Sequence, residues 1–553
     1  MTSGTPVNSR SLHAAGTGSE LTSDRRFANR VGLVENPGSI QNSRILQIRK
    51  STLVQLLDLV IIAAYLLLTV IIGIRCGGSQ SDDVEYFTGG FSHDSDPNPF
   101  RRWLSVLIVG LSIGATFFSG ISMLGYPSQG YSSGVAVGLF VPVLPLACVV
   151  IVWWFLPRFF SSVRIQQHPY EIIEAKMGYS VRAVAAGMYV LLRIGWMGVL
   201  IYAPVTAIMS STSLGYEWFW PLILIIGVSS TLYTTLGGLR GVLVTDAIQF
   251  LVMGLGVVGP IIYILLDERF EFTAAMDFLR QNNRLEFADF QFDITKKFTV
   301  WSVLAGAGVA QLGVAVGDQM SIQRYMAAGS LRESQRAFLF NIVGVIIVVS
   351  LLVLLGVLLS VWYGLHPEST PALDNDHVFP SFVTRNMPAG VPGMILAAIL
   401  AATMSSMTSG INSLAGCLTM DFAARSPKYA DPAARLRFAR LVSVILGLSA
   451  TCLAGFVAQL GEIFDVAQAV LGVFLGPLLI CMGLAVTTWT VAPTAMIRAM
   501  ICGCIAGWGV AFSPAASLWV APAAAAVTLL VALPGLQRSS AEADITDLET
   551  QDF

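Results

Sequence analysis

Residues 394–422 carry a row of hydroxyl side chains through an apolar stretch, MILAAILAATMSSMTSGINSLAGCLTMDF, that has about the length needed to cross a bilayer. On a helix, Ala402, Ser405 and Ser406 occupy positions i, i+3 and i+4 and share one face, which Ser409 continues. Oxygen atoms aligned near the middle of a membrane are suitable ligands for a small, hard cation. The alternative is that these hydroxyls bond to carbonyls of their own helix or allow close helix packing.

The composition indicates a polytopic membrane protein. Hydrophobic residues make up 55% of the 553 residues and charged residues 12%, whereas about 25% of the residues of a soluble domain are charged. The net charge of −2 and the lack of a basic stripe argue against nucleic-acid binding. The seven cysteines lie in or beside apolar runs and show neither zinc-site spacing nor a disulfide framework.

Apolar segments predict an all-α integral membrane protein with about 13 transmembrane helices. These segments span residues 53–75, 103–127, 134–160, 183–208, 217–236, 243–266, 299–319, 337–364, 392–421, 438–458, 462–486, 492–512 and 517–534. Residues 1–50 have the composition of a disordered tail, and residues 536–553 form a short acidic tail. No signal-peptide pattern opens the chain, so we expect segment 53–75 to be an uncleaved anchor, and we expect no further domain after Gly535.

The Lys and Arg residues of the short loops concentrate on one side of the predicted membrane, which should be the cytoplasmic side. This assignment places the N-terminus outside, the C-terminus in the cytoplasm, and loops 267–298 and 365–391 outside. Arg44, Arg49 and Lys50 disagree with it, because they precede the first helix on the external side.

Two predicted helices are interrupted by glycines. They are the segment with Gly110, Gly114, Gly120, Gly125 and Pro127, and the segment with Gly306, Gly308, Gly313 and Gly317. Such interruptions at corresponding places in two halves are typical of inverted-repeat transporters, where an unwound turn exposes carbonyls to an ion. The alternative is that small residues at a spacing of four only pack helices.

Arg193 lies among apolar neighbours in the stretch LLRIGWMGVLIYAP. A buried guanidinium needs a partner, and a substrate carboxylate would accept two parallel hydrogen bonds from it. The alternatives are a structural pair with a carboxylate such as Asp465, or extension of the side chain to the cytoplasmic edge of the membrane.

Enzyme motifs are weak in this sequence. GVAVGD, Gly313 to Asp318, is faintly similar to intramembrane aspartyl proteases, but the second motif of those enzymes, a Tyr-Asp pair, does not occur. There is no His-Glu-x-x-His helix, and His168 and His377 have no Cys or second His at ligand spacing. We therefore expect neither an enzyme nor a transition-metal site.

Four stretches together resemble the sodium:solute symporter family. They are GLSIGATFFSGISMLGYPSQGY (110–131), GGLRGVLVTDAIQF (237–250), DQMSIQRYMAAGSLRESQRA (318–337) and SSMTSGINSLAGCLTMDF (405–422). The first is most similar to the sodium/iodide and sodium/monocarboxylate branch. The resemblance implies an inverted repeat of five helices, 103–266 and 299–486, in an amino-acid-transporter-like fold, with an extra helix at 53–75 and two C-terminal helices at 492–534.

The resemblance also implies cation sites. One sodium ion would lie between helices 103–127 and 392–421, bound by the carbonyls of Ala115, Phe118 and Ala402 and the hydroxyls of Ser405 and Ser406. A second sodium ion would use Asp246 with Ser405, Thr408 and Ser409. Asp246 lies within a membrane segment, where an ionisable residue is a candidate functional group. Its alternative role is to stabilise the positive N-terminal end of its helix.

The family substrate position corresponds here to Ser122, Trp196, Gln311 and Gln468. Sugar carriers of the family place aromatic gating residues where this chain has Val314 and Ala315, so a stacked hexose fits less well. The resemblance to sialic acid carriers implies that Arg193 binds a substrate carboxylate.

These observations predict a sodium-coupled symporter of the cell membrane that imports a small organic solute by alternating access. We expect an organic anion, such as a monocarboxylate or a sialic-acid-like compound, with sodium as coupling ion and no cofactor. The alternatives are a sodium-dependent sugar or polyol symporter and a transporter-like solute sensor.

Overall fold

The computed structural model describes residues 37–76, 118–162, 169–212, 214–327, 330–367, 375–421, 426–429, 431–457 and 459–538, and isolated positions between 100 and 115 and at 423. Side chains of the first helix are described from Leu56 onward. The chain divides into two units, Met1–Leu56 and Leu57–Phe553, and the second contains every described helix after residue 76. Residues 1–36 of the predicted N-terminal tail and 539–553 of the predicted acidic tail lie outside the described residues.

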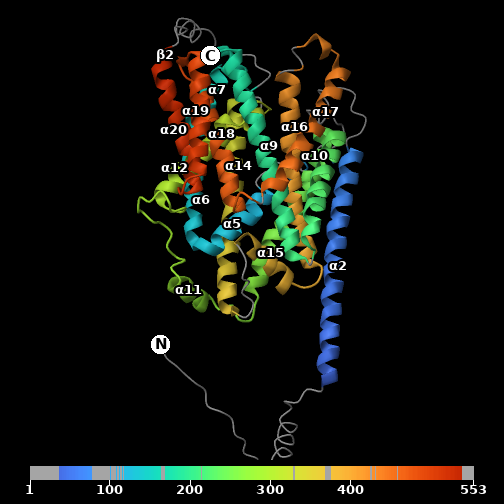
Figure 1. Ribbon diagram of the computed structural model, residues 1–553. Helices are drawn as coiled ribbons and strands as arrows, with labels where there is room; N and C mark the ends of the chain where they lie inside the picture. The colour runs from blue at the N-terminus through green and yellow to red at the C-terminus, as the bar shows by residue number, and fades with distance from the viewer. Residues whose placement is uncertain are drawn as a thin grey trace, which may run out of the picture. The chain divides into compact units, whose positions relative to one another are not determined.

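Helices make up almost all of the described structure (Figure 1). The α-helices are α2 (Pro37–Cys76), α5 (Gly120–Ser133), α6 (Phe140–Val149), α7 (Leu156–Ser162), α8 (Glu171–Met177), α9 (Tyr179–Ser211), α10 (Phe219–Leu265), α11 (Phe272–Gln281), α12 (Val300–Leu312), α13 (Gln319–Ala327), α14 (Leu331–Leu365), α15 (Asn375–Asn386), α16 (Val391–Asp421), α17 (Pro432–Val457), α18 (Ile463–Ala485), α19 (Pro493–Ala511) and α20 (Val520–Ala532). Short 3-10 or π turns are η1 (Gly134–Leu139), η2 (Val150–Phe155), η3 (Tyr216–Trp218), η4 (Gly313–Gly317), η7 (Pro427–Tyr429), η8 (Ser517–Trp519) and η9 (Leu533–Gly535).

The described residues contain 11 helical stretches that are long and apolar enough to cross a membrane. Their bounds follow the predicted segments closely, but the predicted count of 13 is not confirmed. The two longest stretches, Gly120–Ser162 and Tyr216–Leu265, are each interrupted by a glycine with positive φ, Gly134 or Gly238. As a straight helix α10 would be about 70 Å long, more than twice the apolar thickness of a bilayer, so the break at Gly238 must divide it between two crossings.

Both predicted helix breaks are present. In the first, Ser119 is extended (φ −138°, ψ 155°) and α5 begins after it. In the second, α12 widens into the π turn η4, Asp318 is extended (φ −80°, ψ 118°), and α13 begins at Gln319. The division into two five-helix repeats remains a prediction.

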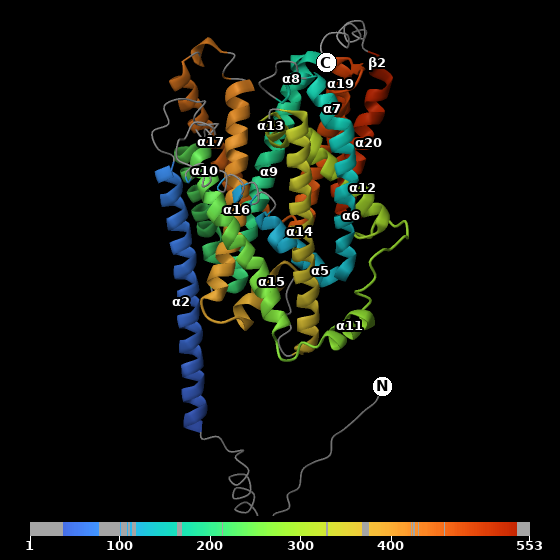
Figure 2. The same ribbon diagram turned by 180° about the vertical axis from the view of Figure 1, so that it is seen from behind.

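Helix α16 forms the centre of the second unit. In its most apolar window 83% of the residues are buried, compared with 22–61% in the other membrane-crossing stretches. It packs against α5, α9, α10 and α17, and α10 and α17 lie beside it in Figures 1 and 2. Its N-terminal turn is held by Asp58 of α2, whose Oδ1 accepts a hydrogen bond from the Gly393 backbone N–H (2.9 Å).

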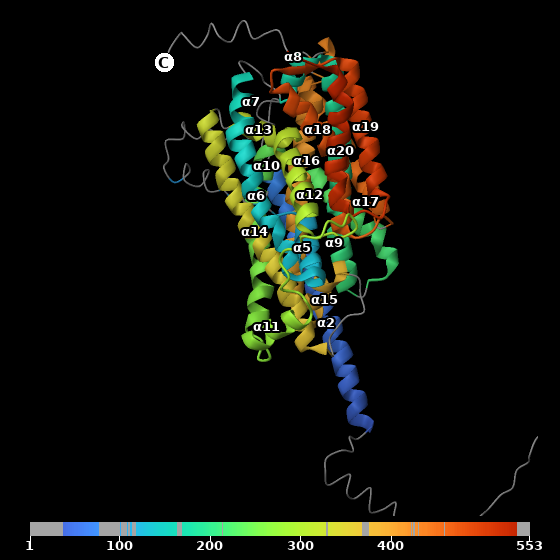
Figure 3. The ribbon, with the colours of Figure 1, turned by 90° about the vertical axis from the view of Figure 1, so that its left-hand side faces the viewer.

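Two details correct the sequence-based boundaries. Helix α2 begins at Pro37, so the predicted disordered tail 1–50 extends too far; proline is favourable in a first helical turn because it needs no hydrogen-bond acceptor there. Two short strands, β1 (Trp489–Val491) and β2 (Leu536–Arg538), pair antiparallel, so the predicted acidic tail begins too early. Near them, α19 and α20 pack against α18 along one side of the unit (Figure 3).

Candidate solute and cation site

The break before α5 lies directly against α16. The Ser119 and Ser122 side chains cap the start of α5 in a reciprocal capping box. Gly120 permits the close approach, because a Cβ there would lie 2.0 Å from Thr403 Oγ1 of α16. Thr403 Oγ1 in turn donates a hydrogen bond to the Leu200 carbonyl of α9 (3.1 Å). The unwound turn is therefore fixed beside the hydroxyl row.

Three of the five predicted sodium ligands are joined by hydrogen bonds at this contact. Ser406 Oγ donates a hydrogen bond to the Phe118 carbonyl (3.3 Å), and the Phe118 N–H donates to the Ala115 carbonyl (3.2 Å). Ser405 is 1% exposed, and its Oγ has no hydrogen-bond partner among the described residues. Ala402, the fifth predicted ligand, is buried one helical turn before Ser406. A buried hydroxyl without a partner is costly, and a cation would satisfy it.

Asp246, the acidic residue of the predicted second sodium site, is buried within α10. Its Oδ2 accepts a hydrogen bond from Ser112 Oγ (3.0 Å), and Ser112 precedes the break in the chain. Thr408 Oγ1 donates to the Ser405 carbonyl (3.0 Å), and Ser409 lines a cavity beside α16. Ser112 was not among the predicted residues, although its place in GLSIGA, ahead of the break, could have indicated it.

The cavity beside the hydroxyl row has a volume of about 310 Å³. This volume is at the lower end of the range for small-molecule sites. Of the predicted residues, the following line it: Ser122, Arg193, Trp196, Gln468, Ser405, Ser406 and Ser409. Its wall also includes residues that the sequence did not indicate, chiefly Asp318, Tyr126 and Phe464. One cavity is thus lined by several of the predicted substrate residues and by three serines of the predicted cation sites.

Gln311 is the predicted substrate residue that does not line this cavity. It lies on α12, just before the π turn Gly313–Gly317. A π turn inserts an extra residue per turn and shifts the angular positions of the residues after it. Val314, within that turn, contributes to the wall instead.

Arg193 forms an ion pair with Asp318 inside the cavity wall. The guanidinium Nη2 donates to Asp318 Oδ2, and both side chains are at least 90% buried. The expected alternative of a structural pair with a carboxylate is therefore present, but the partner is Asp318 rather than Asp465, which pairs with Lys297 (2.9 Å). Arg193 does not extend to the membrane edge, because its side chain is buried in this pair. The sequence signal for this pair was the position of Asp318 between two apolar stretches, because a charged residue within a membrane segment rarely lacks a partner.

A polar cluster joins the helices at one end of the cavity. Lys297 Nζ lies 3.3 Å from Glu462 Oε2 and 2.9 Å from Asp465 Oδ2. Gln129 of α5 donates a hydrogen bond to the same Glu462 oxygen (3.1 Å). Burial raises the pKa of Glu462, but Lys297 and the hydrogen bonds around the carboxylate outweigh it and hold the pKa below its usual range. We call Lys297, Glu462, Asp465 and Gln129 the mouth cluster.

A comparison with protein-family models matches residues 101–503 to the sodium:solute symporter family. This match covers both helix breaks, α16 and the residues that line the cavity. The chain belongs to this family. The resemblance expected from the four sequence stretches is confirmed, and the family consists of transporters rather than enzymes.

Curated relatives of this symporter differ in what their names say they carry. The chain is 26% identical to sodium-coupled monocarboxylate transporter 1 of Mus musculus, over 84% of this chain and 72% of that protein. It is 27% identical to the sodium/sialic acid symporter SiaT of Proteus mirabilis, over 76% of this chain and 82% of that one. It is 28% identical to the Homo sapiens sodium/iodide cotransporter, over 74% of this chain and 61% of that protein.

A solved structure supports the fold of the symporter. It is the substrate-bound, outward-open state of a Na⁺-coupled sialic acid symporter, with a TM-score of 0.73 and 23% sequence identity. The match covers 87% of this chain and 99% of that one. The predicted all-α membrane fold is therefore confirmed.

Proposed function

We propose that this protein imports a small organic anion together with sodium by alternating access. The observation that carries the proposal is the single cavity that joins the hydroxyl row of α16 to a buried arginine. Relatives named as sodium-coupled monocarboxylate and sialic acid symporters support both the ion and the anionic class of solute. A short carboxylate, or the carboxylate end of a larger acid, suits a cavity of about 310 Å³.

Sodium is the proposed coupling ion, with no further cofactor. The carbonyls of Ala115, Phe118 and Ala402 and the hydroxyls of Ser405 and Ser406 would bind it. These five oxygens carry no formal charge, so the ion can also be released. Thr408, Ser409 and Asp246 would serve a second ion or its release path.

The energetics make a second sodium useful. One charge crossing 100 mV releases about 2.3 kcal/mol, and a tenfold sodium gradient adds roughly 1.4 kcal/mol, so one ion could accumulate a neutral solute roughly 500-fold. A monovalent anion carried with one sodium moves no net charge and uses only the gradient. A second ion per cycle would restore the electrical contribution.

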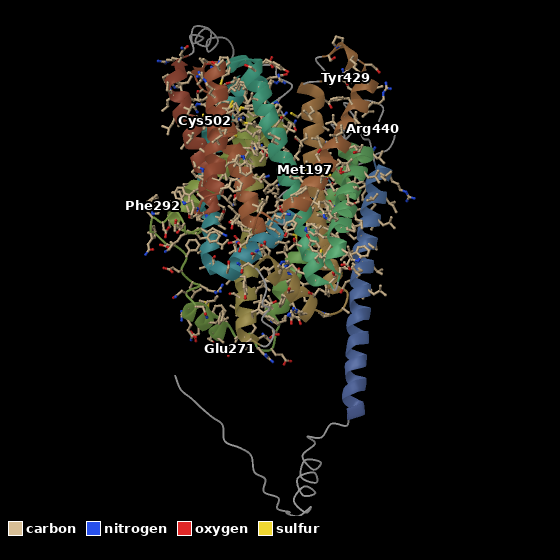
Figure 4. The ribbon with its side chains drawn as sticks, viewed as in Figure 1. Met197, Glu271, Phe292, Tyr429, Arg440 and Cys502 are labelled. Carbon is tan, nitrogen blue, oxygen red and sulfur yellow. The ribbon has the colours of Figure 1, made fainter. Side chains whose placement is uncertain are left out.

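We place the protein in the cell membrane, with the ends of the helices near Arg440 in the cytoplasm. Figure 4 shows Tyr429 and Arg440 at one end of the helices and Glu271 at the other. Lys428 in the turn η7 and Arg435 and Arg437 at the start of α17 belong to the first end, as the positive-inside rule requires of a cytoplasmic side. The C-terminus is then cytoplasmic and the N-terminus external.

A sodium-dependent sugar or polyol symporter is the second candidate. One observation favours it: Asp318 neutralises Arg193, so the cavity wall carries no net charge among its described residues. A neutral solute would not disturb that balance.

Uptake into proteoliposomes tests both candidates. We expect an inward sodium gradient, but not a potassium gradient, to drive accumulation of radiolabelled propionate or a sialic acid, with mannitol and glucose as neutral comparisons. Uptake of a neutral compound alone would establish the second candidate. Solute binding that is indifferent to sodium would contradict the symporter and favour a sensor or a uniporter.

A further inference from the structure

Asp318 gives the solute cavity a second charged residue that the proposed function does not use. Arg193 and Asp318 are the charged side chains among the described residues that line the cavity. Because they form an ion pair within the wall, the cavity carries no net charge. The charge of Arg193 is therefore already compensated before an anionic solute binds.

The position of Asp318 is fixed by contacts other than Arg193. Its Oδ1 accepts the Met320 backbone N–H (2.9 Å), so the same carboxylate that holds Arg193 also caps the start of α13. The preceding residue is held as well, because Tyr170 Oη donates to the Gly317 carbonyl (2.7 Å). Turning the carboxylate away from Arg193 would uncap the helix.

The position of Arg193 is fixed in the same way. Its guanidinium carbon lies 5.5 Å from the centre of the Tyr189 ring, which is a favourable cation–π distance. Separating a buried pair leaves an uncompensated charge and is strongly unfavourable. An incoming carboxylate that displaced Asp318 would have to offset this cost.

Positive charge for a solute can come from the α16 side of the cavity. Ser405, Ser406 and Ser409 line the same enclosure as the ion pair. A sodium ion bound at these hydroxyls would give the cavity a net charge of +1. A monovalent anion would then return it to zero.

We propose that Asp318 neutralises Arg193, so that bound sodium, rather than the arginine, supplies the positive charge that an organic anion requires. This inference rests on the proposed sodium-coupled anion import and adds a reason for the coupling. Arg193 still offers directional N–H donors to the carboxylate, while the charge balance requires the ion. Solute binding without sodium would leave an uncompensated negative charge in a buried site.

Sodium binding without any solute tests the charge balance directly. We would titrate purified, full-length protein with sodium at constant ionic strength, using potassium as the replacement ion, and follow thermal stabilisation. Asp318→Asn leaves the cavity at +1 and should weaken sodium binding roughly tenfold, the scale of one nearby charge at an effective dielectric constant of about 20. Arg193→Gln leaves it at −1 and should strengthen binding by a similar factor.

Asparagine suits this test because it caps helices about as well as aspartate. The double variant Arg193→Gln/Asp318→Asn restores neutrality and should bind sodium as the wild type does. If Asp318→Asn does not fold, the other two variants still give different expectations, namely tighter sodium binding in Arg193→Gln and wild-type binding in the double variant. Sodium affinities that are unchanged, or shifted in the same direction in both single variants, would overturn the proposal.

Solute binding separates failure of this proposal from failure of the proposed function. Wild-type protein should bind propionate or a sialic acid at least tenfold more tightly in sodium than in potassium, whereas Asp318→Asn should bind the same probe with little difference between the two ions. If Asp318→Asn keeps the wild-type ratio of solute affinities in sodium and potassium, the role of Asp318 is refuted and the proposed function is not. A wild type that binds neither probe would refute the proposed anionic solute, and the sodium titration would still decide the charge balance.

Discussion

At the residue scale, neighbouring serines of α16 have different surroundings. Ser406 Oγ donates to the Phe118 carbonyl and so links α16 to the unwound turn before α5. Ser405 Oγ is buried without a hydrogen-bond partner among the described residues. An unsatisfied buried hydroxyl destabilises a fold by roughly 1–3 kcal/mol, so its retention at this position is consistent with an ion ligand rather than a packing residue.

Ser405→Ala separates these two roles. Without sodium we expect the variant to melt at the wild-type temperature or slightly above it, because an unsatisfied polar atom is removed. In sodium the stabilisation seen in the wild type should be lost, and half-maximal uptake should require roughly tenfold more sodium, equivalent to about 1.4 kcal/mol of lost ion binding.

Ser360→Ala is the matched control for this serine. Ser360 is also buried, but its Oγ donates to the Val357 carbonyl of its own helix (2.8 Å). This variant should keep the sodium dependence of the wild type. A Ser405→Ala protein that melts lower in potassium and responds normally to sodium would show that the hydroxyl is structural.

At the element scale, glycines set how closely the helices around the cavity approach one another. Gly356 of α14 packs against α5, where an added Cβ would lie 2.4 Å from the Pro127 carbonyl oxygen and 2.8 Å from Gly130 Cα. Both obstacles are backbone atoms, which cannot rotate away as a side chain could. The neighbouring turns of α14 line the cavity through Val345, Val348 and Val349.

Gly356→Ala should therefore push α14 away from α5. Overpacking of this kind typically costs about 1–3 kcal/mol, and we expect a lower melting temperature together with weaker solute binding. The control is Gly254→Ala on α10, where an added Cβ meets no atom within 4 Å. Equal effects of the two substitutions on melting temperature would show that helix propensity, rather than close packing, controls stability here.

At the scale of the whole second unit, the mouth cluster joins segments that are far apart in the chain. Gln129 belongs to α5, Lys297 precedes α12, and Glu462 and Asp465 lie at the start of α18. Lys297 also lies 5.8 Å from the centre of the Phe464 ring, and Phe464 lines the cavity. The cluster therefore connects the cavity to three parts of the fold.

The mouth cluster should make stability depend on pH. The folded protein holds the pKa of Glu462 below its usual range, so this carboxylate stabilises the fold above its unfolded pKa, about 4.3, and the contribution is lost as the pH falls through the lower, folded pKa. Lys297→Met should lower the melting temperature by roughly 2 °C at pH 7.5. The difference from the wild type should shrink towards pH 3.5.

Lys296→Met is the neighbouring control, because Lys296 pairs with Asp289 on an exposed loop (2.9 Å) and exposed pairs contribute little. Burial raises the pKa of Asp376, so this residue makes the fold less stable as the pH rises. The effect is the same in the wild type and both lysine variants and therefore cancels in the comparison. A Lys297→Met difference that is the same at both pH values would contradict the role of Glu462.

Much of the fold could be predicted from the sequence because membrane helices are encoded locally. A run of apolar residues satisfies its own backbone hydrogen bonds and must be about one bilayer thick. Most helix bounds were therefore predicted to within a few residues, and both breaks were found from their glycines. The row from Ala402 to Ser409 was also readable, because helical periodicity alone places those side chains on one face.

Tertiary structure decided which side chains meet across the fold. Arg193 and Asp318 are separated by 125 residues, and local spacing gave no reason to prefer Asp318 to Asp465 as the partner. Gln311 does not line the cavity, whereas Val314 in the π turn does. Lys297 contacts Glu462, which is 165 residues away in the chain. The helices, the family and the hydroxyl row could all be predicted from local sequence patterns. The charge balance of the cavity depended on long-range pairing, because an ion pair forms wherever the packed helices bring opposite charges within a few ångströms of each other.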